Sequence, residues 1–370
     1  MRELIRANAG LLLVGVTTFV MMGAGQSLYG PALPAFARDL ALSGPEAGWL
    51  VSAHWIGCAF GVAGMYFRGT HVSPRMVLAT MALGAGLLAL GAGLWITVLG
   101  ALVFGTGYGA ATVAFNPRIL KAFGPGGTSM LSLLNASFGI GAIAAPLGFV
   151  ALGSVPARAY AVVAVMAVAI WLAAGPLGRR DGPTVEVTPG PFRPRFGLLM
   201  FAVLGIGIEA CLIGLGPTAL IAAGLTEASA AQHLSMFFVA FLGSRLVLVF
   251  AAHLIRPFTI YLCAMMLAAT SALLAIWLSP GVFFVALGAA AGMFFPSFYV
   301  AASRAMGDDP RVAPTIIAAG LVGGIASPIL LGAVMDGLGQ TGFFWVMGAA
   351  AALSAGAGVV VRQTLPELRT

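Results

Sequence analysis

The stretch GRRDGPTVEVTPGPFRPR, residues 178–195, is the one substantial hydrophilic segment of the sequence. On both sides of it apolar runs recur, each near the roughly 20 residues that an α-helix needs to cross a bilayer. With glycine, proline and charge taken as boundaries, hydropathy gives six such runs before the segment and six after it. The sequence therefore predicts an all-α membrane protein with twelve transmembrane helices.

The twelve predicted spans fall into two halves joined by the hydrophilic segment. We expect an N-terminal six-helix bundle over residues 1–177, a cytoplasmic linker over 178–196 and a C-terminal six-helix bundle over 197–370. In chain order the predicted spans cover residues 9–31, 47–67, 75–94, 97–117, 128–150, 157–177, 197–222, 231–253, 258–278, 282–303, 313–334 and 342–361.

The composition excludes a water-soluble core. Of the 370 residues, 60% are hydrophobic and 8% are charged, whereas a soluble globular domain carries about 25% charged residues. The apolar run near the N-terminus follows a basic start, as in a signal peptide, but it is too long and no small-residue cleavage site follows it. We therefore interpret it as the first span. The other connections are short, so we expect no soluble active site and no nucleotide-binding domain.

The positions of the basic residues predict the topology. The formal net charge of +7 is compatible with nucleic-acid binding, but the basic residues are distributed as a membrane topology requires. Of the 18 Lys and Arg residues, all but Arg38, Arg158 and Arg245 fall on one side if both termini are cytoplasmic. This asymmetry follows the positive-inside rule. We expect a multi-pass protein of the cell inner (plasma) membrane with both termini in the cytoplasm, and no nucleic-acid partner.

Several stretches resemble the major facilitator superfamily, and together they extend over essentially the whole chain. GTGYGAATVAFNPRI (105–119) and LSLLNASFGIGAIAAP (131–146) are similar to the fourth and fifth spans of its fucose–glucose permease-like branch. GIEACLIGLGPTAL (207–220) and FFVAFLGSRLV (237–247) are similar to the seventh and eighth spans of that branch, and GAVMDGLGQTGFFW (332–345) to the loop after the eleventh.

The resemblance implies a fold of two pseudo-symmetric six-helix bundles and a secondary active transporter that works by alternating access. It favours a proton-coupled permease or symporter for a small organic solute. Two motifs depart from the superfamily pattern: Arg68 stands where the loop after the second span usually has an aspartate, and the segment ALVFGTGYG (101–109) lacks the arginine often found in the fourth span. The usual gating ion pairs and coupling stoichiometry are therefore not carried over.

Glu209 lies in GIGIEACLIG, residues 205–214, where the only other ionisable group between Phe196 and Leu225 is the thiol of Cys211. A carboxylate at bilayer depth costs a few kcal/mol, so intramembrane charges are functional candidates by default. Arg245, on the following span, is at a compatible depth. We predict that Glu209 and Arg245 couple transport to protons. The alternative is a permanent ion pair that fixes the register of two helices.

Other polar or aromatic residues inside predicted spans are candidates for substrate binding. They are Gln26, Tyr29, His54, Asn135 and Tyr299. Gln26 could instead satisfy backbone groups near a proline, because buried amides always need a partner but rarely a ligand. His54 could instead be a hydrogen-bonded core residue, and it is also a candidate for titration near neutral pH.

The two halves show a faint internal repeat with a shift of 183 residues. The shift places Gln26 on Glu209 and Ser52 on Ser235. Transporters built from two similar halves carry their binding site near the membrane midplane, between the repeats.

No catalytic or metal-binding constellation stands out, so we expect no enzyme activity, no cofactor and no bound metal. Cys58, Cys211 and Cys263 lie in apolar runs without metal-ligand spacing and are interpreted as small core residues. We expect a monomer that contacts membrane lipid, a small-molecule substrate and a coupling proton. Three alternatives remain: an exporter of amphipathic or drug-like compounds, a copper transporter using His233 and Met236, and a non-transporting membrane scaffold for assembly of a complex.

Overall fold

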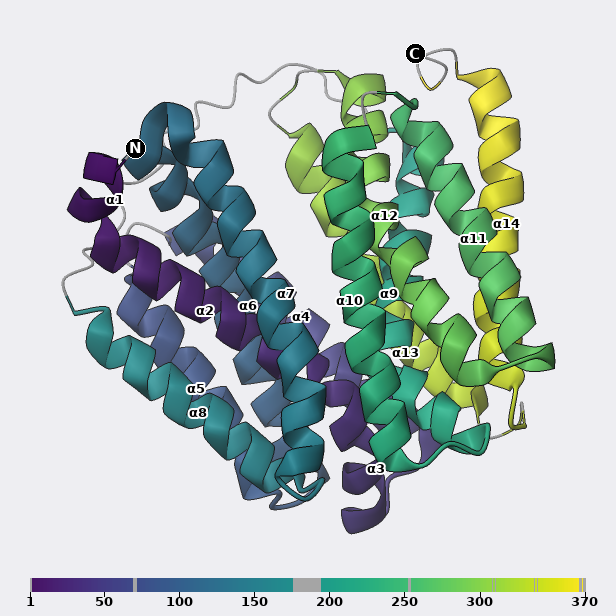
Figure 1. The fold of residues 1–370 in the computed structure, drawn as a ribbon, viewed down its shortest axis with the longest axis horizontal. Helices are drawn as coiled ribbons and strands as arrows, with labels where there is room; N and C mark the ends of the chain where they lie inside the picture. Colours follow the sequence, from purple (N-terminus) through teal and green to yellow (C-terminus); the bar gives the residue numbers. More distant parts are fainter. Residues whose placement is uncertain are drawn as a thin grey trace. The chain divides into compact units, whose positions relative to one another are not determined.

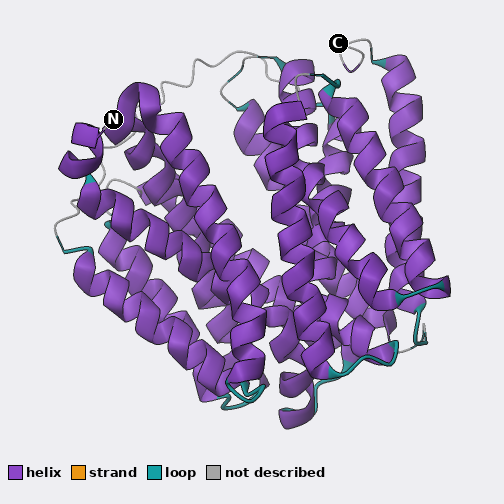
Figure 2. Cartoon of the chain, viewed as in Figure 1, coloured by secondary structure: helices purple, strands orange, loops and turns teal. Residues whose placement is uncertain are grey.

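The structure of the protein is a computed structural model. Among the residues that it describes, the regular elements are α-helices and 3-10 turns (Figure 2). The structure describes residues 2–68, 72–175, 194–251, 254–307, 309, 311–335, 337, 339–365 and 368. Most of the predicted linker, residues 178–196, lies outside the described residues.

The helices follow one another with short connections. In chain order they are α1 (Arg2–Ala7), α2 (Ala9–Ser27), α3 (Tyr29–Asp39), α4 (Gly44–Arg68), α5 (Pro74–Leu90), α6 (Leu94–Phe123), α7 (Gly127–Ala151), α8 (Pro156–Ala173), α9 (Phe196–Ala222), α10 (Glu227–Ala251), α11 (Pro257–Trp277), α12 (Pro280–Met306), α13 (Val312–Met335) and α14 (Gly342–Thr364).

Within the described residues, eleven helices are long and apolar enough to cross a membrane. The apolar helix α5 has 17 residues, corresponds to the third predicted span, residues 75–94, and brings the number of membrane helices to twelve. At 1.5 Å per residue it is about 26 Å long, slightly less than the roughly 30 Å of a typical hydrocarbon core. The all-α fold with twelve membrane helices, predicted from hydropathy, is confirmed.

The chain divides into two compact units, Met1–Ser43 with Trp49–Thr184, and Gly44–Gly48 with Val185–Thr370. In the first unit α2 packs along α7, and α5 packs between α6 and α8 (Figure 1). In the second unit α9 packs along α13, while α11 lies between α12 and α14. Helix α10 packs on the other side of α12. Each unit therefore has its own core of interlocked helices.

Two predicted span ends differ from the structure by six residues or more. The first span was expected to end at residue 31, but the chain continues as α3 to Asp39 after a short break at Leu28. Pro31 lies in the first turn of α3. The backbone N–H groups of a first turn have no acceptor within the helix, so proline, which lacks this N–H, is tolerated there. Helix α6 likewise continues through Pro117 to Phe123, six residues beyond the predicted end. Both predictions were wrong because proline was treated as a boundary.

Glycines bring helices α4 and α6 into close contact. A Cβ atom at Gly105 would collide with the carbonyl oxygen of His54, and one at Gly109 with that of Cys58. On the facing helix, Gly57 and Gly61 lie against the carbonyl oxygens of α6 residues in the same way. Small residues at helix interfaces let two backbones approach closely in a membrane. The GTGYG stretch, residues 105–109, therefore serves helix packing.

Candidate functional site

Glu209 belongs to the second unit and is buried. It is the fourteenth residue of α9, so its Cα lies about 20 Å along the helix axis from Phe196. Its side chain is 8% exposed, and its Oε2 atom has no hydrogen-bond partner among the described residues. A buried carboxyl oxygen without a partner is costly, and such groups are concentrated at functional positions. The structure thus keeps the Glu209 carboxyl group largely out of contact with bulk water.

Arg245 of α10 interacts electrostatically with Glu209. Its guanidinium also has two contacts of its own within the unit: Nε donates to the carbonyl oxygen of Gly292 at 3.2 Å, and the group lies 4.2 Å from the centroid of the Phe241 ring. The bond to Gly292 is possible because that residue has no side chain: a Cβ there would collide with Ser244 and with the carbonyl oxygen of Phe241. The α10–α12 crossing therefore holds Arg245 in place.

In the first unit, Gln26 is bound by a residue that was not among the predicted site residues. The hydroxyl of Tyr108 on α6 donates to Gln26 Oε1 on α2 at 2.7 Å. This bond satisfies the Oε1 atom of the buried Gln26 amide. It also connects α2 with α6 through two residues that are 82 positions apart in sequence. The sequence signal for Tyr108 was its place between the glycines of GTGYG, which bring its helix against α4.

His54 stands at the centre of a group of rings. Its imidazole centroid lies 5.1 Å from those of Tyr29 and Tyr108, with the Tyr108 ring edge-on to it. Its Nε2 atom is 3.6 Å from the sulfur of Cys58, one helical turn further along α4. The His54 Nδ1 and Tyr29 hydroxyl atoms are buried without a partner in the described part of the chain. Three predicted site residues, Gln26, Tyr29 and His54, are thus connected through Tyr108 and its neighbours.

Asn135 and Tyr299 have only local contacts among those that the structure describes. Asn135 is exposed on α7, and its Nδ2 donates to the carbonyl oxygen of Leu131 in the preceding turn at 2.9 Å. Tyr299 is half-buried on α12 and lies against the ring of Phe295 in the same helix. Their assignment to substrate binding stays a prediction.

His233 and Met236 point to different surroundings on α10. His233 Nδ1 lies 2.7 Å from the carbonyl oxygen of Ser229, and its Nε2 edge faces Gly281 of α12. Met236 is exposed. Among the described residues, no three His, Cys, Asp or Glu side chains gather where they could hold a metal ion.

Comparison with known proteins gives one sequence match and many structural ones. The family model described as Major Facilitator Superfamily matches residues 15–321. No curated protein sequence matches the chain.

Three solved structures with a similar fold are those of transporters. A mutant of the nucleoside transporter NupG is 14% identical, with a TM-score of 0.79 over 95% of this chain and 99% of that one. The D-xylose-proton symporter is 12% identical, with a TM-score of 0.76 over 94% and 96%. A mutant of the fucose:proton symporter FucP of E. coli is 15% identical, with a TM-score of 0.63 over 94% and 98%. At these identities the likeness shows a shared fold.

Proposed function

The chain belongs to the Major Facilitator Superfamily and is a multi-pass secondary transporter, not an enzyme; from this we propose that it moves a small organic solute together with protons. Two bundles, residues 1–177 and 197–370, would alternate the access of a central site while the linker 178–196 joins them. We place the protein in the inner membrane with both termini in the cytoplasm, because this arrangement puts most Lys and Arg residues on the cytoplasmic side.

The buried carboxyl group of Glu209 is the observation that carries proton coupling. A charged carboxylate is costly at membrane depth, whereas its protonated form is tolerated there. Arg245 acts electrostatically on Glu209 from the neighbouring helix. If the distance between them changes during transport, the affinity of Glu209 for a proton changes with conformation. A group of this kind binds a proton in one state and releases it in another, which is what coupled transport requires.

The polar and aromatic residues of the first unit support an organic solute. Gln26 keeps its amide nitrogen as a donor while Tyr108 occupies Oε1, and such amides bind hydroxyl or carbonyl groups. Tyr29, His54 and Tyr108 present aromatic faces close by. Two of the structural neighbours are named as proton symporters of sugars and one as a nucleoside transporter. We include Asn135 and Tyr299 as further contacts to the solute.

The test is a proton-flux assay in reconstituted proteoliposomes loaded with a pH-sensitive dye. Sugars, nucleosides, amphipathic drugs and soft metal ions are added one at a time to wild-type protein and to Glu209→Gln. We expect an organic solute to drive proton movement in the wild type and not in the variant, because glutamine keeps the size of the side chain but binds no proton.

A matched control removes a carboxylate outside the membrane core. Glu3→Gln changes an exposed residue of α1, and we expect it to keep solute-driven proton flux. Solute flux that continues in Glu209→Gln with its proton coupling intact would contradict the assignment of Glu209. Proton movement driven only by copper ions would replace the organic solute with the metal.

Export of an amphipathic or aromatic compound is the second candidate, favoured by the ring cluster around His54. Direction is tested with the same vesicles by imposing proton gradients of opposite sign. Uptake of solute against its gradient when the vesicle interior is acidic indicates proton exchange and export. Uptake when the outside is acidic indicates symport and import.

A further inference from the structure

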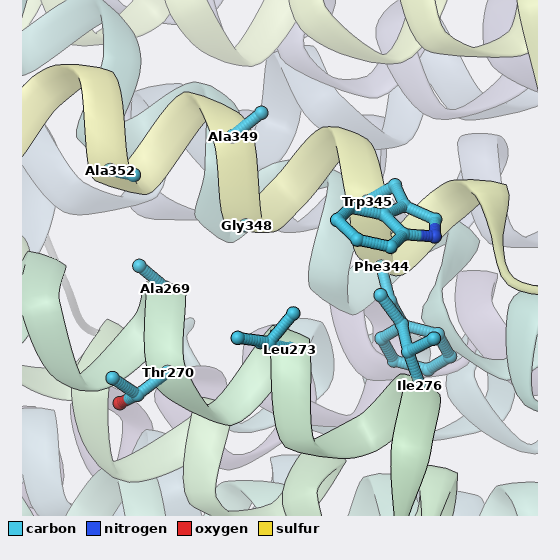
Figure 3. Close-up of a pocket in the computed structure, with 9 residues that line it drawn as sticks. All are labelled: Ala269, Thr270, Leu273, Ile276, Phe344, Trp345, Gly348, Ala349 and Ala352. Carbon is cyan, nitrogen blue, oxygen red and sulfur yellow. The ribbon is translucent and has the colours of Figure 1, made fainter.

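Helices α11 and α14 of the second unit form an apolar groove of about 290 Å³. Figure 3 shows side chains of the two helices facing each other across it. Ala269, Thr270, Leu273 and Ile276 line one wall, and Phe344, Trp345, Gly348, Ala349 and Ala352 line the other. None of the predicted site residues is among them, so the groove is separate from the proposed proton and solute residues.

Apart from the indole N–H of Trp345 at one end, the lining side chains offer no polar group that is not already hydrogen-bonded in the described part of the chain. The single hydroxyl, that of Thr270, donates to the carbonyl oxygens of Met266 and Leu267 in its own helix. The floor is open because the residues there are small. At Gly348 the two helices come close, because a Cβ atom there would lie only 3.2 Å from the Cβ of Ala272. The chemistry of the walls therefore fits a hydrocarbon.

The groove runs from the end of a membrane helix towards its middle. Ile276 is one residue from the end of α11, and Phe344 is two residues after the start of α14. From Ile276 to Ala269 the groove extends about 10 Å along α11. Trp345 is half exposed at the outer end, and in Figure 3 its indole nitrogen lies on the side of the ring away from Gly348. Tryptophan is enriched where a membrane meets water.

We propose that this groove binds one acyl chain of a membrane phospholipid, with the glycerol and headgroup beside Trp345. The acyl chain would lie along Leu273 and Gly348. The indole N–H of Trp345 would be available to an ester carbonyl of the lipid where the membrane meets water. The size of the groove decides against a protein partner. Nine residues line it, whereas a stable protein interface uses about 20–30 residues on each side.

The test uses vesicles of phosphatidylcholine in which a fraction of the lipid carries a photoreactive diazirine near the end of one acyl chain. The full-length protein is reconstituted, illuminated and digested, and cross-linked peptides are identified by mass spectrometry. We expect labelling to concentrate on groove residues such as Leu273 and Ala269, several-fold above other lipid-exposed residues of the same two helices.

Two variants fill the groove and one serves as their control. Gly348→Leu places a side chain on the floor, and Ala352→Phe fills the inner end from an exposed position. Gly356→Leu makes the same glycine replacement on α14 where no atom lies within 4 Å of the new Cβ. We expect the filling variants to lose the excess labelling and Gly356→Leu to retain it.

Three results would overturn the proposal. Even labelling of all exposed residues of α11 and α14 would mean passing contact with bulk lipid. Excess labelling that persists in Ala352→Phe would mean that the acyl chain lies elsewhere, provided that the melting curve shows this variant to be folded. A disulfide between two copies of the protein, formed by oxidation of the variant Leu273→Cys or Ala349→Cys, would mean that a second molecule covers the groove.

Discussion

The hydroxyl of Tyr108 donates a 2.7 Å hydrogen bond to Oε1 of Gln26, and so connects α6 with α2 inside the first unit. Tyr108 reaches this position because the glycines on either side of it bring α6 against α4 and α5. The same tyrosine ring meets His54 edge-on. One residue thus joins a predicted solute contact to the aromatic group around the histidine.

Tyr108→Phe should destabilise the protein and weaken solute binding. The substitution leaves Gln26 Oε1 without its donor in a buried setting, and an unsatisfied buried polar group costs about 1–3 kcal/mol. We expect a lower apparent melting temperature in detergent and a higher KM for the solute. Tyr66→Phe is the control, because Tyr66 is an exposed tyrosine at the end of α4. Equal melting temperatures for the two variants would contradict a contribution of the Tyr108–Gln26 bond to stability.

Arg245→Lys should impair transport although it retains a positive charge. Lysine has no Nε–H in a planar fork to donate to Gly292, and it stacks less well on an aromatic ring. We expect slower solute-driven proton flux than in the wild type, with proton dependence retained. Arg245→Ala removes the charge acting on Glu209, so this variant should lose both the solute-driven proton flux and the proton dependence of transport. Flux measured in proteoliposomes decides: wild-type rates in the lysine variant would show that the contacts to Gly292 and Phe241 are dispensable.

Gly105→Ala should destabilise the first unit. The added Cβ collides with the carbonyl oxygen of His54, and overpacking of this kind costs typically 1–3 kcal/mol. Gly86→Ala on α5 is the matched control, since nothing lies within 4 Å of the new atom. An alanine at such a helix position is expected to be neutral or stabilising by roughly 0.5–1 kcal/mol. The melting temperature should therefore fall in Gly105→Ala and stay equal or rise in Gly86→Ala, and an equal fall in both variants would contradict close α4–α6 packing.

The loop between α12 and α13 carries a local ion pair whose pH dependence can be stated. Arg311 donates from its side chain and backbone N–H to the carboxylate of Asp309, and these bonds lower the pKa of that carboxyl to about 2. Because this pKa is lowered in the folded protein, the contribution of the ionised Asp309 to the stability of the loop is complete above its unfolded pKa of about 3.9. It is lost only as the pH falls towards 2.

Asp309→Ala should therefore reduce hydrogen-exchange protection of the Arg311 amide by the same several-fold factor at every pH from 5 to 8. The two side chains are 31% and 28% exposed, and an ion pair that solvent reaches in this way contributes little to global stability, so the melting temperature should stay unchanged. Mass-spectrometric hydrogen exchange compares the variant with the wild type at each pH. A protection difference that grows or shrinks within this range would mean that another titrating group controls the loop.

The sequence by itself determined the number of spans and the depth of Glu209 within its span. These properties depend on local composition: each apolar run is long enough to satisfy its backbone hydrogen bonds as a helix in lipid, whatever its neighbours are. The helix ends at Pro31 and Pro117 were predicted less well, because a proline near a helix terminus or inside a packed helix is tolerated.

Only the tertiary structure decided which side chains meet. The bonds of Tyr108 to Gln26 and of Arg245 to Gly292 join residues 82 and 47 positions apart. Membrane helices are apolar on nearly all sides, so hydropathy specifies no buried face and leaves the rotation of each helix about its axis undetermined. That rotation is fixed by packing at glycines such as Gly105 and Gly292, where neighbouring backbones come close enough to leave room for one arrangement.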